Sequence, residues 1–246
     1  MKILAIESSA TACSAALWED GSILAQNGQN SGLTHSRTLL PMVDSMLVNS
    51  GHTLPEVDVV AVAAGPGSFT GLRIGVAAAK GLAWVEDKDC APCSTLESMA
   101  WPLAHMEGAV IVCAMDARRK QVYNALFLAK NGQLERLCQD RAISLVQLGE
   151  ELKSYTNRKI VVGDGACLCY NALLEELPDL ELAPGHLRMQ SAVGVAMAAE
   201  RLTQQGGLVK GGELVPVYHR LSQAERERLA REQSASNILE GDKQNV

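Results

Sequence analysis

The stretch GPGSFTGLRIGVAAAKGLA, residues Gly65 to Ala83, decides how the rest of the sequence is interpreted. It follows an apolar, β-branched run at residues 57–64, which is typical of a buried strand. Glycine reaches positive φ at little cost and proline fixes its own φ, so Gly65-Pro66-Gly67 predicts a sharp turn. Ser68 and Thr70 then offer N-caps for a helix that we expect to run to about Val85.

The predicted helix carries unusually little side-chain bulk. Small residues recur along it at Gly71, Gly75, Ala77, Ala78, Ala79 and Gly81. Because glycine inside a helix costs about 1 kcal/mol relative to alanine, we expect some other group to approach this backbone closely. The residues alone leave three interpretations open: a helix packed tightly on its own sheet, a turn that cradles phosphate, or a contact with a partner helix.

Composition narrows the class of protein. The chain has 246 residues, is 47% hydrophobic and carries a net charge of −6, so a protein-wide electrostatic grip on nucleic acid is excluded and RNA binding would need a local basic patch. No run approaches the ~18 apolar residues of a membrane span. The first nine residues lead directly into a strand that contains Glu7, unlike a signal peptide. We expect a soluble, cytoplasmic protein.

The sequence offers little support for a metal or redox site. Seven cysteines are scattered through apolar stretches, where thiols behave as small hydrophobic groups. Cys90 and Cys93 form a C-x-x-C, but no second pair or nearby histidine completes a tetrahedral zinc site. The five histidines are dispersed, and none joins a Ser-His-Asp or Cys-His arrangement. We predict no metal and no catalytic residue.

The predicted elements recur in the same order. The first set comprises strands at 3–6, 14–18 and 23–26, a helix at 34–51, a strand at 57–64 and a helix at 70–85. The second comprises strands at 110–115, 121–129 and 134–137, a helix at 144–155, a strand at 160–163 and a helix at 166–177. Glu7 and Asp116 end the first strand of each set. The sequence therefore predicts a duplicated βββαβα fold of the α/β class, with two mixed sheets.

Two such units predict two domains with a ligand-binding cleft between them. We place them at residues 1–108 and 109–221, followed by a polar tail at 222–246 that is expected to be helical or disordered. Residues that could contact a nucleotide or phosphate in the cleft are Glu7, Ser8, Ser9, Gly65, Gly67, Ser68, Asp116, Arg118 and Arg119. The turn is not a Walker loop, because it lacks Gly-Lys-Ser/Thr and the only nearby cation is Arg73, within the helix.

The duplicated core resembles the actin, sugar kinase and Hsp70 ATPase superfamily, which has a ribonuclease H-like fold. More specifically, GPGSFTGLR, HSRTLLPMV (residues 35–43), MDARRKQVY (residues 115–123) and PVYHR (residues 216–220) resemble the TsaB family, also called YeaZ, over about residues 1–220. The chain departs from the family's usual Asp-Thr-Ser at the first strand end, where it has Glu7-Ser8-Ser9.

The resemblance implies a non-catalytic scaffold in bacterial tRNA threonylcarbamoyladenosine synthesis. Such a subunit pairs with TsaD and with the ATPase TsaE, so that TsaD transfers a threonylcarbamoyl group to the adenosine next to the anticodon. TsaD binds its metal through His-x-x-x-His; the corresponding positions here are Thr95 and Met99, which suit no such metal. The resemblance also implies a homodimer in isolation, tRNA contact only through the complex, no intrinsic cofactor, and ATP or ADP at a complex interface.

The implied partner interface uses two helices. Its residues are Thr34, His35, Leu39, Leu40, Val43, Met46, Leu47, Gly71, Leu72, Gly75, Ala78, Ala79 and Leu82. On this view Gly75→Leu disrupts pairing and leaves the monomer folded. Two alternatives remain: an independent nucleotide-dependent enzyme that uses the cleft, and a metallopeptidase-like protein of the same superfamily.

Overall fold

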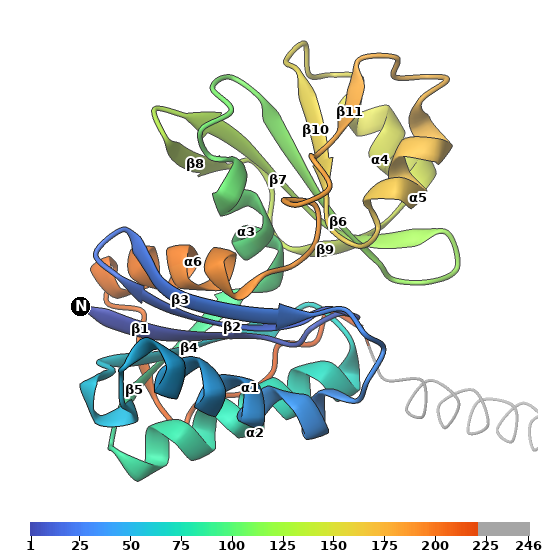
Figure 1. Cartoon of the computed structure of the whole chain (residues 1–246). Coiled ribbons are helices and arrows are strands. Elements are labelled where there is room, and N and C mark those ends of the chain that lie inside the picture. The colour runs from blue at the N-terminus through green and yellow to red at the C-terminus, as the bar shows by residue number, and fades with distance from the viewer. Residues whose placement is uncertain (221–246) are drawn as a thin grey trace, which may run out of the picture.

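The computed structural model describes residues 1–220, arranged as two mixed sheets with helices on both faces of each (Figure 1). The predicted tail at 222–246 lies outside the described residues. The first sheet has the strand order β12-β5-β4-β1-β2-β3. Its strands are β1 (Lys2–Glu7), β2 (Cys13–Glu19), β3 (Ser22–Gln29), β4 (Val59–Gly65), β5 (Asp89–Ser94) and β12 (Val209–Lys210).

The second sheet has the order β11-β10-β6-β7-β8, and β9 also pairs with β7. Its strands are β6 (Val110–Asp116), β7 (Gln121–Lys130), β8 (Gln133–Arg136), β9 (Arg141–Ser144), β10 (Lys159–Val162) and β11 (Leu180–Leu182). The two units repeat the same pairing. The first strand is antiparallel to the second, as in β1–β2 and β6–β7, and parallel to the strand that follows the first helix, as in β1–β4 and β6–β10. This repetition confirms the duplicated βββαβα fold.

Helices cover both faces of each sheet. The first sheet packs against α1 (His35–Ser50) and α2 (Phe69–Val85) on one face and α6 (Ala192–Gln204) on the other. The second packs against α4 (Leu145–Leu152) and α5 (Ala166–Leu173) on one face and α3 (Thr95–Ala100) on the other. Two short 3₁₀ helices, η1 (Leu54–Glu56) and η2 (Trp101–Leu103), complete the elements. Helices α4 and α5 end several residues before the predicted ends at 155 and 177.

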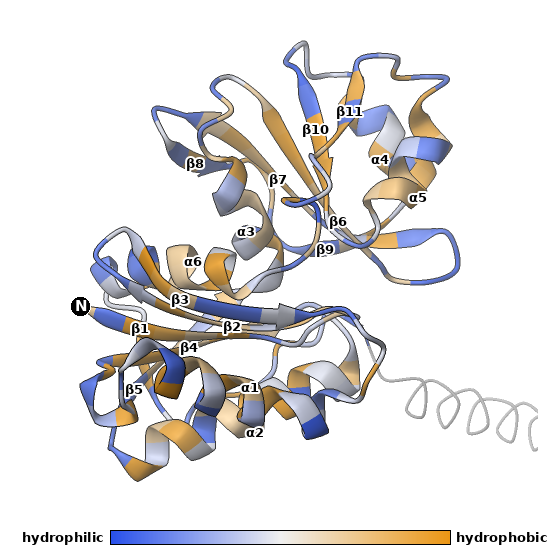
Figure 2. Cartoon of the chain, in the orientation of Figure 1, coloured by the Kyte–Doolittle hydropathy of each residue, from blue (hydrophilic) through white to orange (hydrophobic). Residues whose placement is uncertain are grey.

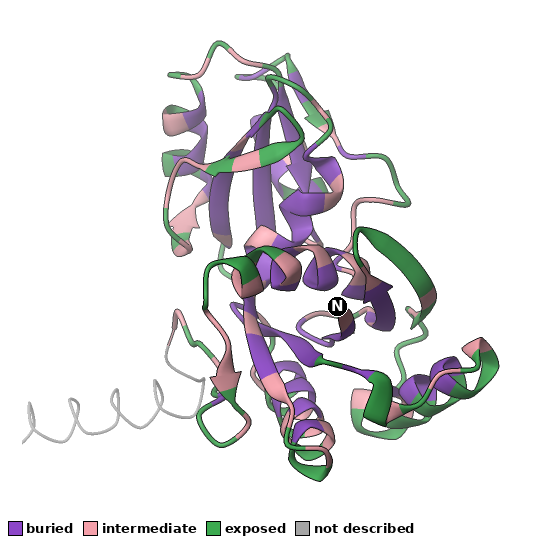
Figure 3. Cartoon of the chain, turned by 90° about the vertical axis from the view of Figure 1, so that its left-hand side faces the viewer, coloured by how far each residue is buried: buried purple, intermediate pink, exposed green. Residues whose placement is uncertain are grey.

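Hydrophobic residues concentrate between these layers. Figure 2 shows hydrophobic colours along strands of both sheets, whereas the second half of β3 is hydrophilic. Strand β4 is buried along its whole length, as a central strand covered on both faces must be. Figure 3 shows the same contrast as buried central strands and largely exposed outer segments. Because successive side chains along a strand point to opposite faces, each sheet contributes to two separate hydrophobic cores, one on each face.

Two helices cross between the predicted domains. Helix α3 follows β5 of the first sheet, yet its side chains pack on the second sheet with Ile111 and Phe127. Helix α6 follows the second sheet and packs on the first, where β12 also pairs with β5. Both helices therefore lie between the sheets (Figure 1). The predicted boundary after residue 108 separates the main strands of the two sheets. It does not separate the helices or β12, because α3 lies before the boundary and packs on the second sheet, whereas α6 and β12 lie after it and pack on the first.

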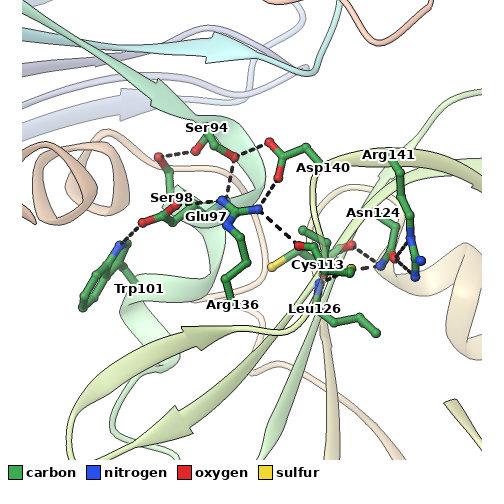
Figure 4. Close-up of polar contacts among 12 residues, drawn as sticks. Ser94, Glu97, Ser98, Trp101, Cys113, Asn124, Leu126, Arg136, Asp140 and Arg141 are labelled. Carbon is green, nitrogen blue, oxygen red and sulfur yellow. Dashed lines mark hydrogen bonds and ion pairs between the residues drawn. The ribbon is translucent and has the colours of Figure 1, made fainter. Parts of the chain in front are cut away.

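An ion-pair network fixes α3 against the second sheet (Figure 4). The guanidinium of Arg136 contacts the carboxylates of Glu97 at 2.7 Å and Asp140 at 2.6 Å, and it lies 4.6 Å from the ring centre of Phe127. Ser94 donates its hydroxyl to Asp140 at 2.6 Å and accepts from the Glu97 backbone N–H, so it also caps α3. Charge-assisted bonds in a half-buried setting are stronger than exposed pairs, and here they join the end of β5 to β8.

Candidate functional site

The turn after β4 packs against two distant segments of the chain, although Ser68 is exposed. The Ser68 hydroxyl accepts a hydrogen bond from the Gly71 N–H at 3.3 Å, which confirms the predicted cap of α2. The Ser68 N–H donates to the Ser9 carbonyl at 2.7 Å, and the Val217 N–H donates to the Ala64 carbonyl at 2.7 Å. At Gly65, φ is +144° and a Cβ would collide with the Val217 carbonyl oxygen. Only glycine therefore fits at position 65.

The late PVYHR segment also packs on the start of α2. The rings of Phe69 and Tyr218 stack with their centres 4.1 Å apart, and the Arg73 Nε donates to the Tyr218 hydroxyl at 3.0 Å. Arg73 lies over both rings, so this cation of α2 is engaged with aromatic groups. Two of the sequence motifs that are far apart in the chain are thus one structural unit.

Two glycines of α2 seat the end of β1. A Cβ at Gly71 would collide with the Ser8 carbonyl oxygen, and a Cβ at Gly75 would collide with the Ser8 hydroxyl. The Ser8 hydroxyl in turn donates to the Gly71 carbonyl at 2.9 Å. The close approach expected from these small residues is therefore made by the chain's own first strand, so the prediction that Gly75→Leu leaves the monomer folded is corrected.

Glu7 lies in a fully buried setting at the end of β1. Burial raises the pKa of its carboxyl group from 4.5 to about 7; hydrogen bonds from Ser9 act in the opposite direction, and the charge of Asp164 adds to the rise. The Ser9 backbone N–H donates to one carboxylate oxygen, while the other has no partner among the described residues. Burial is the main cause of the raised pKa of the Cys13 thiol, and the charge of Glu7 adds to this rise. Glu7 is therefore an acid shielded from solvent.

The corresponding end of β6 is open to solvent. Asp116 accepts a hydrogen bond from the Arg118 N–H at 2.7 Å, and both arginines after it are exposed. Asp164 follows β10; its charge adds to the raised pKa of Glu7, and the charge of Asp116 adds to the raised pKa of Asp164 itself. Burial raises the pKa of Asp164, whose carboxylate accepts from the Gln190 side chain at 2.7 Å. The structure thus links the predicted Glu7 and Asp116 through Asp164.

Asp164 and Gln190 were missed by sequence reasoning, although a signal existed. Gly163-Asp164-Gly165 follows β10 as Gly65-Pro66-Gly67 follows β4, and in both places an added Cβ would meet the end of the unit's first strand or a segment lying against it. A comparison of these turns would have placed Asp164 beside Asp116. Gln190 gave no such signal, because it lies in an irregular segment that the repeat does not contain.

The ends of β1 and β4 leave few polar groups free to bind a ligand. Ser8 and Ser9 are buried, and the turn N–H of Ser68 is already bonded to the chain itself. Of the predicted phosphate contacts, Ser68 is exposed at the start of α2, and Asp116, Arg118 and Arg119 are exposed on the opposite unit. A cavity of about 520 Å³ lies nearby, between the ends of β2 and β3 and segment 189–193. None of the predicted nucleotide contacts lines it.

Other predicted positions belong to the cores. Thr95 and Met99 of α3 are buried, Met99 among the apolar side chains over the second sheet. Cys90 and Cys93 point to opposite faces of β5, one into each core, and burial raises the pKa of both thiols. Within residues 1–220, no three His, Cys, Asp or Glu side chains gather as metal ligands. Across the same span, no helix is long and apolar enough to cross a membrane.

The predicted interface residues divide into two groups. Side chains that pack inside the first unit are Leu39, Val43, Met46, Leu47, Leu72 and Ala79, and Gly71 and Gly75 are buried with them. Those with partial or full exposure are Thr34, His35, Leu40, Ala78 and Leu82. Burial within the monomer removes the first group from any rigid docking surface, because their side chains already fill the core.

Comparisons with known proteins agree with this architecture. The family described as "TsaD: tRNA N6-adenosine threonylcarbamoyltransferase" matches residues 29–161. The chain is similar to the tRNA threonylcarbamoyladenosine biosynthesis protein TsaB of Bacillus subtilis, with 32% identity over 92% of this chain and 96% of that protein. It is 31% identical to the Escherichia coli TsaB over 89% of this chain and 92% of that protein.

Solved structures give the same result. A Pseudomonas aeruginosa protein described as similar to peptidase YEAZ superposes with a TM-score of 0.76 and 26% identity, covering 89% of this chain and 99% of that one. A ROK hexokinase from Thermus thermophilus shares the fold alone, with a TM-score of 0.50 and 11% identity over 84% of this chain and 100% of that one. The duplicated fold, the near-complete coverage and the shared identity together show that this chain belongs to the TsaB (YeaZ) family.

Proposed function

We propose that this chain is a non-catalytic subunit in the synthesis of threonylcarbamoyladenosine next to the tRNA anticodon. It pairs with a TsaD-type transferase and works with the TsaE ATPase. Support comes from relatives that carry the TsaB name over nearly their whole length, and from the match of residues 29–161 to the TsaD description. A nucleotide would be held at an interface of this assembly.

The observation that carries the non-catalytic assignment is the burial of α3. By resemblance, TsaD places two metal-binding histidines at the positions of Thr95 and Met99. Here Thr95 is fully buried, and Met99 packs in the apolar core over the second sheet. Glu97 of the same helix is bound to Arg136 and Trp101. The helix thus acts as a core element, which favours a supporting role over metal-assisted transfer.

Exposed apolar and small residues on the two helices support pairing through α1 and α2. We call them together the α1–α2 face; they are Leu40, Val48, Ala77, Gly81, Trp84 and Val85. The side chains of Trp84 and Val85 are 81% and 71% exposed, and a Cβ at Gly81 would meet nothing within 4 Å. Large exposed apolar groups beside small ones are typical of helix docking surfaces. The face lies on the same two helices as the predicted interface but uses mainly their outward positions.

Ala77→Arg tests the pairing. This side chain points outward from α2, so we expect the variant to keep the wild-type melting temperature and to weaken binding to the TsaD-type partner at least about tenfold, or ~1.4 kcal/mol. Calorimetric titration measures the affinity. Ala172→Arg, at an exposed alanine of α5, is the matched control and should bind normally.

Wild-type affinity for Ala77→Arg would refute docking through the α1–α2 face. Light scattering on the chain alone shows whether a second copy uses the same surface, because a homodimer there would also be lost in this variant. Omission of the chain from a reconstituted reaction tests the accessory role: tRNA modification by the TsaD-type enzyme should then stop.

A further inference from the structure

The turn between β6 and β7 presents three consecutive cations, Arg118, Arg119 and Lys120. It projects from the second sheet as the light green loop at the right of Figure 1. All three residues are exposed, and the Arg118 side chain is 87% exposed. We call these three residues the basic tip. In a chain with a net charge of −6, such a group forms a local basic patch.

The backbone of the basic tip is held in an uncommon conformation. The φ angles of Arg118, Arg119 and Lys120 are +65°, +55° and +57°, in the left-handed region that costs a non-glycine residue of the order of 1 kcal/mol or more. Hydrogen bonds from Gln121 to the Arg118 carbonyl and from Leu145 to the Lys120 carbonyl close the turn. Two carbonyl groups of the turn are thus used internally, while the three cationic residues are exposed. Glycine or asparagine would fit this turn with less strain.

Six other cations in the part of the chain that the structure describes are held in close ion pairs, unlike Arg119 and Lys120. Arg136, Arg141, Lys153, Arg158, Lys159 and Lys210 each contact a carboxylate at 2.6–2.8 Å. At the basic tip only Arg118 has an acidic neighbour, Asp116 at 3.7 Å. Arg220 adds a fourth positive group at the base, where it donates to the Ala117 carbonyl. Asp116 therefore offsets part of the charge of Arg118, whereas Arg119 and Lys120 have no carboxylate within ion-pair distance among residues 1–220.

We propose that the basic tip binds backbone phosphates of the tRNA, so that this chain contacts the RNA itself. Exposed cations without an apolar centre are typical of nucleic-acid interfaces, whereas protein interfaces usually centre on buried apolar or aromatic anchors. This inference rests on the proposed function, which brings a tRNA to the assembly. It replaces the expectation that tRNA is reached only through the partner.

The test compares two double variants of the full chain in complex with the TsaD-type partner. Arg118→Asn/Arg119→Asn removes two cations and keeps residues that tolerate positive φ. Lys130→Gln/Arg201→Gln removes the same charge from exposed positions away from the tip. Fluorescence anisotropy with an unmodified tRNA transcript gives the affinity at several salt concentrations. Co-elution of the two proteins and thermal melting are measured separately.

For the tip variant we expect affinity for tRNA to fall about tenfold or more near 0.1 M salt, and the slope of log K against log[salt] to decrease by ~1.5, as the loss of two phosphate contacts predicts. The control variant should stay within about twofold. Equal losses in both variants, or an unchanged slope at the tip, would overturn the inference. If co-elution is lost instead, the tip contacts an acidic protein surface and the RNA assignment is wrong. Failure of the wild-type chain to pair at all contradicts the proposed function instead.

Discussion

The two halves of the molecule end their first strands in opposite ways. Glu7 at the end of β1 is fully buried, and the turn after β4 closes over the adjoining Ser8 and Ser9. Asp116 at the end of β6 is exposed and leads into the basic tip. Both ends occupy the same place in the duplicated βββαβα order. Position in a repeated fold therefore does not fix chemistry, because the residues that pack on each strand end decide whether it is accessible.

The closed half shows what the small residues of α2 do. Gly71 and Gly75 allow the helix to lie directly on Ser8, because a Cβ at either position would collide with that residue. In the open half, Gly165 lies close to the Asp116 backbone N–H, yet the carboxylate and the following cations remain outside. The same order of elements thus ends in a packed junction in one half and in an exposed one in the other.

The largest expected effect comes from Gly71→Ala, which disrupts the contact between α2 and Ser8 at the closed strand end. The added Cβ would collide with a backbone oxygen of Ser8, which cannot rotate away as a side chain could. We expect the free energy of unfolding to fall by about 3 kcal/mol or more, the upper range for overpacking. Urea denaturation followed by circular dichroism measures the loss. A change below ~1 kcal/mol would show that β1 and α2 can separate at little cost.

The second effect concerns the buried acid. The pKa of Glu7 is about 7 in the folded chain and 4.5 otherwise, so between these values the unfolded chain releases a proton that the folded chain retains. Stability from this group is therefore present below pH 4.5 and is lost as pH rises to about 7, by about 3 kcal/mol in total. We expect Glu7→Gln to remove this decline, so the variant gains on the wild type in denaturation midpoint as pH rises from 5 to 8.

Asp116→Asn provides the matched control for Glu7→Gln, because it replaces the carboxylate at the open strand end. The variant should keep the decline that comes from Glu7, because Asp116 is not among the groups that raise the pKa of Glu7, although its removal acts on Asp164. If Glu7→Gln retained the wild-type decline between pH 5 and 8, another group would be responsible, and the contrast between a closed and an open end would lose its electrostatic basis.

The sequence predicted the architecture well because its repeat is expressed in local patterns. Apolar strands that end in Glu7 and Asp116, together with the Asp20-Gly21 and Asn131-Gly132 turns, are visible in the chain. Such patterns report on periodicity and turn conformation, which are local properties.

What the sequence could not show depends on contacts between distant segments. The approach of Ser8 to Gly71 and of Val217 to Gly65 reverses the meaning of the small residues, because a helix without bulk can face its own sheet or a partner. The exchange of α3 and α6 between the sheets is also non-local. The positive φ angles of Arg119 and Lys120 are not indicated by residue type either, and the Lys120 carbonyl accepts a hydrogen bond from the distant Leu145.

The smallest expected effect separates the two surfaces of α2. Gly81 lies in the same helix as Gly71, but a Cβ there would meet nothing within 4 Å, so Gly81→Ala gains helix propensity without a collision. We expect the free energy of unfolding to rise by up to about 1 kcal/mol, measured by the same urea denaturation as for Gly71→Ala. Loss of stability in both variants would mean that α2 tolerates no added bulk on either side. If Gly71→Ala lowers the free energy of unfolding and Gly81→Ala raises it, the inner glycines are needed for the contact with Ser8. Gly81 then belongs to the α1–α2 face, where its lack of a side chain matters only to a partner.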